Sequence, residues 1–402
     1  MTVPLLRVSQ SARIGPRGIS RARAEVPVQD VVFMAALHSG LDPQQVTEML
    51  SGPMGAVLRA LQRIGALVWD LPGVATLEVL APRLPLTVPT QRPGPARLSR
   101  FAVLRRDGDG THPWLLESGL SQYRLRLTDA GMVQLPGGAG WLGGLLDLAG
   151  FLDSQDARAE GWSVHDLLFQ ARTRSSMELR DPPARQRGVP PEAVQPEAAP
   201  LAVQLPPAAG PSPDEPSLWE ATESRRTRRD FTGAPVTLAC LGALLWRTLR
   251  VTGRQAADPA DPLAYDVVFR PVPSGGSMHA SDLWLLCRDV EGLRPGVYRY
   301  DPVRHGLVDV GGRLPTELPA PVVGIITARH KRTAWKYEPF ALALELKDLG
   351  VQLMALQLSA PTVGLGVVPI GSGGTDEIGD ALGVDPLVDA PIGEFLLGVL
   401  DA

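Results

Sequence analysis

The chain has 402 residues, which is enough for two or three domains with separate cores. Hydrophobic residues at 44%, charged residues at 20% and a net charge of −4 describe an ordinary globular protein and exclude a general attraction to nucleic acid. The sequence has no run near the roughly 18 apolar residues of a membrane span, no signal-peptide core and no CxxC spacing, so we expect a cytoplasmic protein without a disulfide framework or zinc site.

The chain begins with a basic stretch and continues with helical periodicity. Five arginines and little periodicity in residues 1–25 predict a loosely held arm. The sequence then predicts helices over Val28–Leu37 and Gln44–Leu50, the second with an aspartate cap, and a third helix after Pro53. Strand character follows at Leu67–Trp69.

Three short helices followed by a strand describe a winged helix-turn-helix, which we expect over residues 1–95. Such folds often bind DNA through the third helix. Here that helix offers Arg59, Gln62 and Arg63, which are few for phosphate contacts. DNA, a partner protein and a gripped peptide therefore all stay open as ligands of this region.

A proline-spaced segment, residues 82–95, separates this unit from a second winged-helix-like region that we expect over residues 96–180. Strands are predicted over Ser99–Leu104 and Trp114–Glu117, with Asp107–Gly110 as the turn between them. The order of strand, turn and strand indicates a hairpin.

The segment Gly138–Gly143 matches the dinucleotide-binding pattern GxGxxG. Only a short possible strand precedes it, and no second strand of a βαβ unit follows. We interpret it as a flexible turn before a helix over Leu145–Leu152. His165 and Asp166 open another amphipathic stretch, where such a pair is typical of a cap or a surface contact.

Residues 181–216 are dense in proline, alanine and glutamate and lack periodicity. Proline favours an extended polyproline conformation. The composition predicts a linker that separates the N-terminal half from a domain over residues 217–402.

An arginine cluster follows the linker. Arg225–Arg229 places four arginines around Thr227, and guanidinium groups with a hydroxyl are suited to a phosphate monoester or an anionic ring. A solvated charge run is the alternative. Thr237 then caps a helix with leucines on one face, up to Leu249.

Small residues characterise the next motif, Arg270–Ser277, where a flat ligand could lie close to the backbone. A simple tight turn is the alternative. Strands are predicted after it, over Leu283–Cys287, Gly296–Tyr300 and Leu307–Val310.

A lysine, a phenol and a carboxylate stand together in Trp335–Glu338, between a buried strand at Ile325–Ala328 and a helix that begins near Phe340. A lysine desolvated by Trp335 and Phe340 would have a lowered pKa and could act as a base near neutral pH. The alternative is that Lys336 pairs with a glutamate on a solvated helix face. We expect the leucines from position 342 onward to pack this helix on the strand.

The chain closes with a helix over Gln352–Leu358, a strand that ends in the glycines of Val363–Gly374, and a final strand at Gly393–Gly398. Together these pieces resemble the nitroreductase-like flavin proteins, and among them the SagB-type azoline dehydrogenases of ribosomal peptide maturation (RiPP biosynthesis). The resemblance covers Arg225–Gly398 and extends weakly upstream, where Leu98–Ala102 and residues 164–169 look like that family's winged-helix region.

The resemblance implies an α+β fold, with a C-terminal nitroreductase-like FMN domain whose mixed central sheet is flanked by helices, preceded by winged helices. It implies site residues at motif positions of this sequence. These are the FMN phosphate and ribityl ligands Arg225, Arg226, Thr227 and Arg229, the flavin-ring contacts Pro273, Ser274, Gly275, Gly371 and Ser372, and the catalytic dyad Lys336 and Tyr337. The segment Ser277–Ser281 departs from the family's usual tyrosine-rich continuation.

The activity implied is oxidation of thiazoline or oxazoline rings to thiazoles or oxazoles. Lys336 with Tyr337 would remove the α-proton, hydride would pass to flavin N5, and dioxygen would accept the electrons. The resemblance also implies a homodimer, a precursor peptide bound through its leader region, and a cyclodehydratase partner. An NAD(P)H-dependent nitro or quinone reductase, and a catalytically silent scaffold, are the alternatives.

Overall fold

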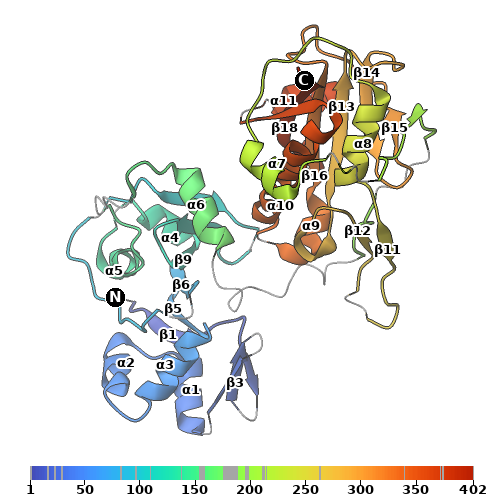
Figure 1. Ribbon diagram of the computed structural model, residues 1–402. Coiled ribbons are helices and arrows are strands. Elements are labelled where there is room, and N and C mark those ends of the chain that lie inside the picture. The colour runs from blue at the N-terminus through green and yellow to red at the C-terminus, as the bar shows by residue number, and fades with distance from the viewer. Residues whose placement is uncertain are drawn as a thin grey trace. The chain divides into compact units, whose positions relative to one another are not determined.

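A computed structural model of the chain contains two compact units, residues 1–182 and residues 183–402 (Figure 1). Among the described residues, none of the helices combines the length and the apolar composition needed to cross a membrane. The structure describes residues 2–15, 18–21, 24–28, 30–81, 84–95, 97–108, 110–136, 138–153, 159–174, 189–194, 199–210, 213, 215–261, 264–338, 340–371, 373 and 375–401.

The N-terminal unit is built on an antiparallel six-stranded sheet with the strand order β1-β5-β6-β9-β8-β7. Because β6 pairs with β9, this sheet includes residues from both sides of the boundary expected at residue 95. The elements of the unit are β1 (Leu5–Val8), β2 (Arg13–Gly15), β3 (Gly18–Arg21), β4 (Ala24–Pro27), α1 (Val31–Ser39), α2 (Pro43–Leu50), α3 (Gly55–Arg63), β5 (Leu67–Leu71), β6 (Ala75–Val79), β7 (Ala102–Arg106), β8 (Trp114–Ser118), β9 (Tyr123–Leu127), α4 (Asp129–Gln134), α5 (Gly140–Leu148) and α6 (Val164–Thr173).

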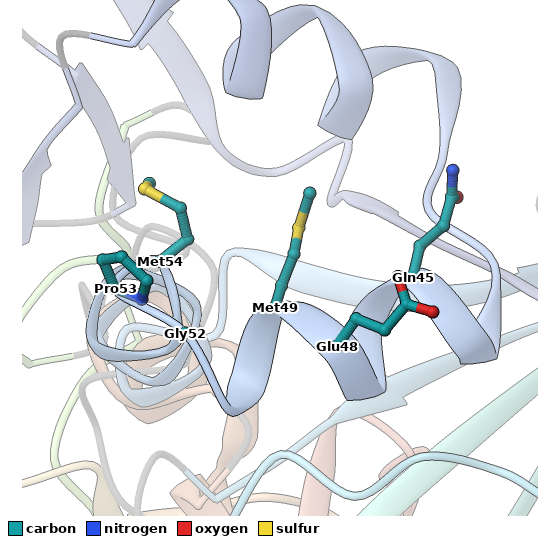
Figure 2. A pocket seen from close by; sticks show the side chains of 6 residues that line it. All are labelled: Gln45, Glu48, Met49, Gly52, Pro53 and Met54. Carbon is teal, nitrogen blue, oxygen red and sulfur yellow. The ribbon is translucent and has the colours of Figure 1, made fainter.

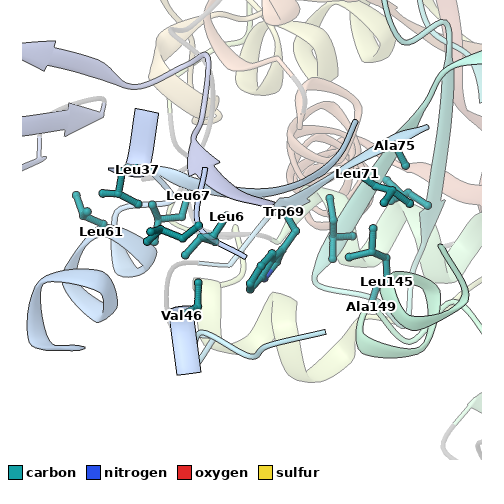
Figure 3. Close-up of a cluster of buried hydrophobic side chains, with 14 of the residues drawn as sticks. Leu6, Leu37, Val46, Leu61, Leu67, Trp69, Leu71, Ala75, Leu145 and Ala149 are labelled. Atoms are coloured by element: carbon teal, nitrogen blue, oxygen red, sulfur yellow. The ribbon is translucent and has the colours of Figure 1, made fainter. Parts of the chain in front are cut away.

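The prediction of a loosely held N-terminal arm is wrong. Strand β1 pairs with β5, and Leu6 is completely buried in the core of the unit. Figure 3 shows Leu6 beside Leu67 and Trp69 within this cluster. The strand pattern was hard to recognise in the sequence, because only alternate side chains of a short edge strand face the core and the others can be arginines.

The three predicted helices and the strand after them are present as α1, α2, α3 and β5. Asp42 caps α2 in a reciprocal capping box with Gln45. The strand continues into the hairpin β5–β6. The arrangement keeps the expected order of helices and strand, and its assignment as a winged helix stays a prediction.

Gly143 of the GxGxxG match and the following Gly144 allow backbones to approach closely. A Cβ atom at Gly143 would lie 1.9 Å from the carbonyl oxygen of Gly138, and one at Gly144 would lie 1.7 Å from that of Thr90. Helix α5 therefore begins at Gly140 and packs directly on backbone. The close contact at Gly143 and the positive φ of Gly138 and Gly140 account for the matched glycines without a nucleotide.

The C-terminal unit contains a seven-stranded sheet with the order β10-β15-β14-β13-β16-β18-β17. Its elements are β10 (Val203–Gln204), α7 (Leu218–Ser224), α8 (Leu238–Thr248), β11 (Gly253–Gln255), β12 (Val267–Phe269), a 3-10 turn (Gly275–Ser277), β13 (Ser281–Cys287), β14 (Gly296–Asp301), β15 (Gly306–Asp309), β16 (Val322–Arg329), α9 (His330–Tyr337), α10 (Ala341–Ser359), β17 (Leu365–Ile370), α11 (Thr375–Leu382) and β18 (Asp389–Val399).

The α+β class is confirmed, but the expectation of a mixed sheet is wrong for the described strands. Each pair of neighbouring strands in this sheet is antiparallel. The helices α9 and α10 connect β16 to β17, which run in the same direction, yet β18 lies between those two strands and opposes both. A helical connection therefore does not create a parallel pair here.

Helices cover both faces of this sheet. Alternate residues of β13 point to opposite sides, so Leu285 joins a cluster with leucines of α8 and α10, while Leu286 joins a cluster with Leu382 of α11. The sheet is thus buried between two helical layers, and the segments that carry the predicted site lie at its ends.

The prediction of a linker without structure of its own is wrong for the described parts of residues 189–210. Val203 and Gln204 form β10 and pair with β15 at the edge of the sheet. Leu205 is buried in the core of the C-terminal unit. The prolines on either side of this strand, Pro200 and Pro206, concealed it in the sequence, because proline is depleted in strands and is tolerated mainly at sheet edges.

The helix predicted near Phe340 is present as α10, but only part of its predicted buried face is buried: Leu349 is, whereas Leu342 and Leu346 are not. Its buried residues are Ala341, Glu345, Leu349, Gln352 and Leu356. Leu342 and Leu346 are instead 39% and 41% exposed. With apolar residues around most of the helix, periodicity could not distinguish the inner face from the outer one.

Candidate functional site

The lysine–tyrosine pair lies at the end of the short helix α9, which follows the central strand β16 directly. Lys336 Nζ donates a hydrogen bond to the hydroxyl of Tyr265. The same Nζ is 4.4 Å from the ring centroid of Tyr265 and 5.0 Å from that of Tyr337. The ammonium is therefore held between two phenols.

The turn of the Pro-Ser-Gly-Gly motif lies against this pair. A Cβ atom at Gly276 would lie 2.2 Å from Tyr337 Oη and 3.0 Å from Lys336 Nζ. Gly276 also has a positive φ of 62°, which a residue with a side chain rarely adopts. Both constraints require glycine where the turn meets the dyad.

An aspartate of α10 holds the start of that turn. Ser274 Oγ donates to Asp348 Oδ2 at 2.6 Å, and the Gly275 amide donates to Asp348 Oδ1 at 3.1 Å. The His279 amide in turn donates to Ser274 Oγ at 3.0 Å. Burial raises the pKa of Asp348 although these two donors oppose the effect. Pro273, just before the turn, is exposed.

The electrostatics of Lys336 differ from the sequence-based prediction. Desolvation lowers its pKa, but hydrogen bonds to the hydroxyls of Tyr265 and Tyr337 more than offset this, so the pKa of Lys336 is raised above its ordinary value. The predicted lowering to near neutral is therefore wrong. A pairing with Glu345 is not seen either, because that carboxylate contacts His330 Nδ1 at 3.1 Å.

The arginine cluster lies in an exposed stretch after α7. The Arg226 guanidinium donates to two backbone carbonyls, those of Glu223 at 2.9 Å and Arg225 at 2.8 Å. Arg228 Nη2 donates to the carbonyl of Asp401 at 3.0 Å. Within the described residues, the side chains of Arg225 and Arg229 have no hydrogen-bond or ion-pair partner, and Thr227 is exposed.

Gly371 follows the last residue of β17, where Ile370 is opposite Glu394 of β18. A Cβ atom at Gly371 would meet open space, whereas one at Gly373 would lie 1.7 Å from Glu394 Oε1. Burial raises the pKa of Glu394. Ser372 lies outside the described residues. A cavity of about 140 Å³ opens here, lined by Ile370, Gly371, Gly373, Ile378, Pro391, Ile392, Gly393 and Glu394.

The structure brings together some of the predicted residues and separates others. Lys336 and Tyr337 meet the turn of Ser274 and Gly275 at one corner of the unit. The arginine cluster is elsewhere: Phe231, two residues after it, bridges to Leu400 beside the start of β17, whereas Gly371 follows the end of that strand. A six-residue strand separates these positions by roughly 17 Å.

Sequence reasoning missed Tyr265 and Asp348. Tyr265 lies 71 positions before Lys336, in a segment without a motif or a periodic pattern. Asp348 belongs to α10, where a single acidic residue on a helix is usually solvated. Neither residue belongs to a sequence pattern that indicates a functional role, because each contributes to the site only through contacts with distant segments.

Two buried arginines hold the surroundings of the dyad. Arg332 of α9 is completely buried and donates to the carbonyls of Met278, Pro191 and Asp266. Arg329 donates to the carbonyls of Glu192 and Ala193, both at 2.8 Å. These bonds fasten residues 191–193 and the loop around Asp266 to the end of β16 and the start of α9, at positions seven and four residues before Lys336.

A second cavity, of about 420 Å³, opens in the N-terminal unit between α2 and α3 (Figure 2). Side chains of Gln45, Glu48 and Met49 line it from α2, and Met54 lines it from the start of α3. Its lining includes the carboxylate of Glu48 and the thioethers of Met49 and Met54, and none of the residues predicted for the site.

Comparisons with known proteins point to one family for the C-terminal unit. Residues 222–399 match the sequence model of the nitroreductase family. A protein of Methanocaldococcus jannaschii, whose name places it among the nitroreductases, is 29% identical over 197 residues, which cover 46% of this chain and 93% of that protein.

Solved structures give weaker matches. A protein of Anabaena variabilis named as a nitroreductase is 25% identical with a TM-score of 0.35, and the match covers 40% of this chain and only 34% of that one. A similarly named protein of Ralstonia eutropha gives 20% identity and a TM-score of 0.40 over 52% and 97% of the two chains.

The microcin synthetase complex McbBCD of E. coli, bound to truncated pro-MccB17, gives 17% identity and a TM-score of 0.35 over 48% and 77% of the chains. With TM-scores below 0.5, nothing about substrate or partners follows from these structures. Residues 222–399 of this protein are similar to the nitroreductase family.

Proposed function

We propose that this protein is an FMN-dependent azoline dehydrogenase, which oxidises thiazoline or oxazoline rings of a ribosomally made peptide to thiazoles or oxazoles. The observation that carries the proposal is the corner where Lys336, Tyr337 and the turn at Ser274–Gly276 meet within a region similar to the nitroreductase family. The same motifs carry the resemblance to the SagB-type enzymes.

The residues present suit FMN, which proteins of the nitroreductase family typically bind. Arg225 and Arg229 offer guanidinium groups without partners in the described residues, and Thr227 adds a hydroxyl, which together form a donor set for a phosphate monoester. Gly371 leaves open space beside the cavity at the end of β17, where a flat ring could approach the backbone. FMN, when bound, supplies a two-electron acceptor for hydride.

The chain's own residues would handle the substrate proton. The carbon of an azoline ring that bears the peptide carbonyl is acidic, because its anion is delocalised into the C=N and C=O bonds. With a raised pKa, Lys336 rests as an ammonium beside Tyr337. The pair must therefore release a proton to solvent before it accepts one from this carbon. Lys336 would then be an ammonium again, and its positive charge would stabilise the carbanion.

The resemblance implies a homodimer with FMN between two copies, and the outer face of α10 supports this. Leu342, Leu346, Val351 and Met354 are 39%, 41%, 39% and 40% exposed, although this helix also packs its inner face into the core. A helix that is apolar on both faces is normally covered on both. We propose that a second copy covers it, since the arginine cluster and Gly371 lie at opposite ends of β17 within one chain.

We further propose that the N-terminal unit grips the leader region of a precursor peptide or contacts a cyclodehydratase. The sequence of three helices and the hairpin β5–β6 supports a winged-helix assignment. The short third helix carries few cations, which favours a peptide or protein over DNA.

The experiment that tests the proposed function is the visible spectrum of the purified protein, with added FMN and then NADPH under anaerobic conditions. A flavin band that NADPH leaves unbleached, and that an azoline peptide bleaches, supports the azoline dehydrogenase with dioxygen as the final acceptor. No band, even with excess FMN, would contradict the flavin site and leave a scaffold role.

A nitro or quinone reductase that uses NAD(P)H is the second candidate. The match of residues 222–399 to the nitroreductase family and the 29% identity to a protein of that name favour it. Rapid bleaching of the flavin by NADPH, followed by reduction of a nitroaromatic compound, would decide for this candidate.

A further inference from the structure

The hydroxyl of Tyr265 contacts both the dyad and the glycine turn. The hydroxyl proton of Tyr265 is donated to the carbonyl oxygen of Gly276, with an O···O distance of 2.8 Å. Toward Lys336 it therefore offers only lone pairs, and Lys336 Nζ donates to it. The loop of Tyr265, the turn of Gly276 and helix α9 meet at this oxygen.

This arrangement distinguishes the two forms of the lysine. An ammonium always has a proton to donate to the phenol oxygen. A neutral amine would also need a donor for its lone pair, which Tyr265 cannot provide while it is bonded to Gly276. The aromatic ring of Tyr265 also favours the charged ammonium, because Lys336 Nζ lies 4.4 Å from the ring centroid.

Packing holds Tyr265 in place. Its ring makes an edge contact with Trp335, with centroids 5.6 Å apart, and Trp335 is buried. The next residue, Asp266, accepts from the Ala193 amide at 2.9 Å, and its carbonyl accepts from Arg332 at 2.8 Å. The position of the phenol is thus set by residues outside the dyad.

We propose that Tyr265 is a positioning residue for the Lys336–Tyr337 pair: its hydroxyl fixes the lysine against the Gly276 turn and keeps it protonated until the reaction needs a base. The proposal rests on the proposed function for its catalytic meaning. The groups that face this hydroxyl are Lys336, Tyr337 and, through its charge, Arg332, while Asp348 holds the neighbouring turn.

The amino-acid usage of the chain makes a direct test possible. Lysine and arginine together number 39, and only three of them are lysines: Lys331, Lys336 and Lys347. Lys331 and Lys347 are exposed. Competitive acetylation with trace acetic anhydride across a pH series, quantified by mass spectrometry, reports the titration of Lys336 with two reference lysines in the same molecule and without any substrate.

In Tyr265→Phe we expect the titration of Lys336 to move to lower pH. At a pH below the midpoint, Lys336 should therefore be acetylated roughly tenfold faster than in the natural protein, which corresponds to the loss of one hydrogen bond to a charged group. The plateau rate at high pH should not change, and Lys331 and Lys347 should titrate as before. The control is Tyr298→Phe, because Tyr298 also donates to a backbone carbonyl, that of Arg294 at 2.7 Å.

The activity readout is the pH profile of azoline oxidation in the FMN-loaded protein. Its rising limb should move to lower pH in Tyr265→Phe, with little change in KM for the peptide. An unchanged Lys336 titration in Tyr265→Phe would overturn the proposal. A second variant, Tyr265→Leu, also removes the ring. A shift seen in Tyr265→Leu but not in Tyr265→Phe would overturn the proposal too, because it would assign the effect to ring packing. If the acetylation shift occurs but no azoline is oxidised, the proposed function fails and the role of Tyr265 toward Lys336 stands.

Discussion

At the scale of single residues, Lys336 is the centre of the candidate chemistry. In a chain that uses arginine almost everywhere, lysine occurs at only three positions. Arginine cannot lose its proton in a protein, whereas lysine can gain and lose one. A lysine held between two phenols is therefore suited to proton transfer, which an arginine at the same place could not perform.

We expect Lys336→Ala to retain FMN and to lower turnover of an azoline peptide by roughly 10²–10⁴, the usual contribution of a positioned proton-transfer group. Absorbance of the bound flavin and single-turnover kinetics would measure the two effects separately. Lys331→Ala is the matched control, because Lys331 is exposed on the same helix. Equal turnover in Lys336→Ala and the natural protein would rule out this residue.

The direction of the Lys336 pKa shift gives a pH prediction. Because its pKa is raised, the proton-accepting form is scarce at neutral pH and grows as pH rises toward that pKa. The kcat for azoline oxidation should therefore increase from pH about 7 to about 9. Stopped-flow measurement of flavin reduction over this range would test it. A rate that falls with rising pH would show that the pair acts as an acid.

At the scale of elements, the strand pair β17–β18 connects the two halves of the proposed cofactor site. The start of β17 lies near Leu400, which forms a bridge with Phe231 just after the arginine cluster. The end of β17 leads to Gly371 and the cavity at Glu394. Within one chain the strand therefore separates the phosphate donors from the open glycine, which is why we propose a cofactor site formed by two copies.

The arginine cluster provides its own control. Arg225→Ala and Arg229→Ala should each raise the Kd for FMN roughly tenfold or more, because each removes a charge-assisted hydrogen bond to phosphate. Arg228→Ala should have little effect, since Arg228 is bonded to the carbonyl of Asp401. Fluorescence titration of the apoprotein with FMN would compare the three variants. Equal affinities in all three would mean that the cluster is only a solvated charge run.

At the scale of the whole molecule, the uncovered apolar face of α10 predicts assembly. We expect the natural protein to sediment as a dimer, and Leu346→Glu or Met354→Glu to shift it toward the monomer and weaken FMN binding, because a charge would be placed in a dry interface. A monomer with stoichiometric FMN would contradict this assembly.

Much of the local structure follows from the sequence. The capping box of α2, the helix α10 and the strands around Leu283 and Gly296 were predictable, because caps and hydrophobic periodicity act between residues close in the chain. The motif at Arg225–Arg229, the Pro-Ser-Gly-Gly turn and Lys336–Tyr337 could also be recognised, since each is a short continuous pattern.

The tertiary structure decided what these pieces do to one another. It placed β18 between β16 and β17, left Leu342 and Leu346 of α10 exposed, and incorporated Val203–Gln204 into the sheet. It also brought Tyr265 to Lys336 across 71 positions and so reversed the predicted direction of the lysine pKa shift. Such contacts join distant segments, and a pKa depends on the groups gathered around an atom in space, which spacing along one chain does not encode.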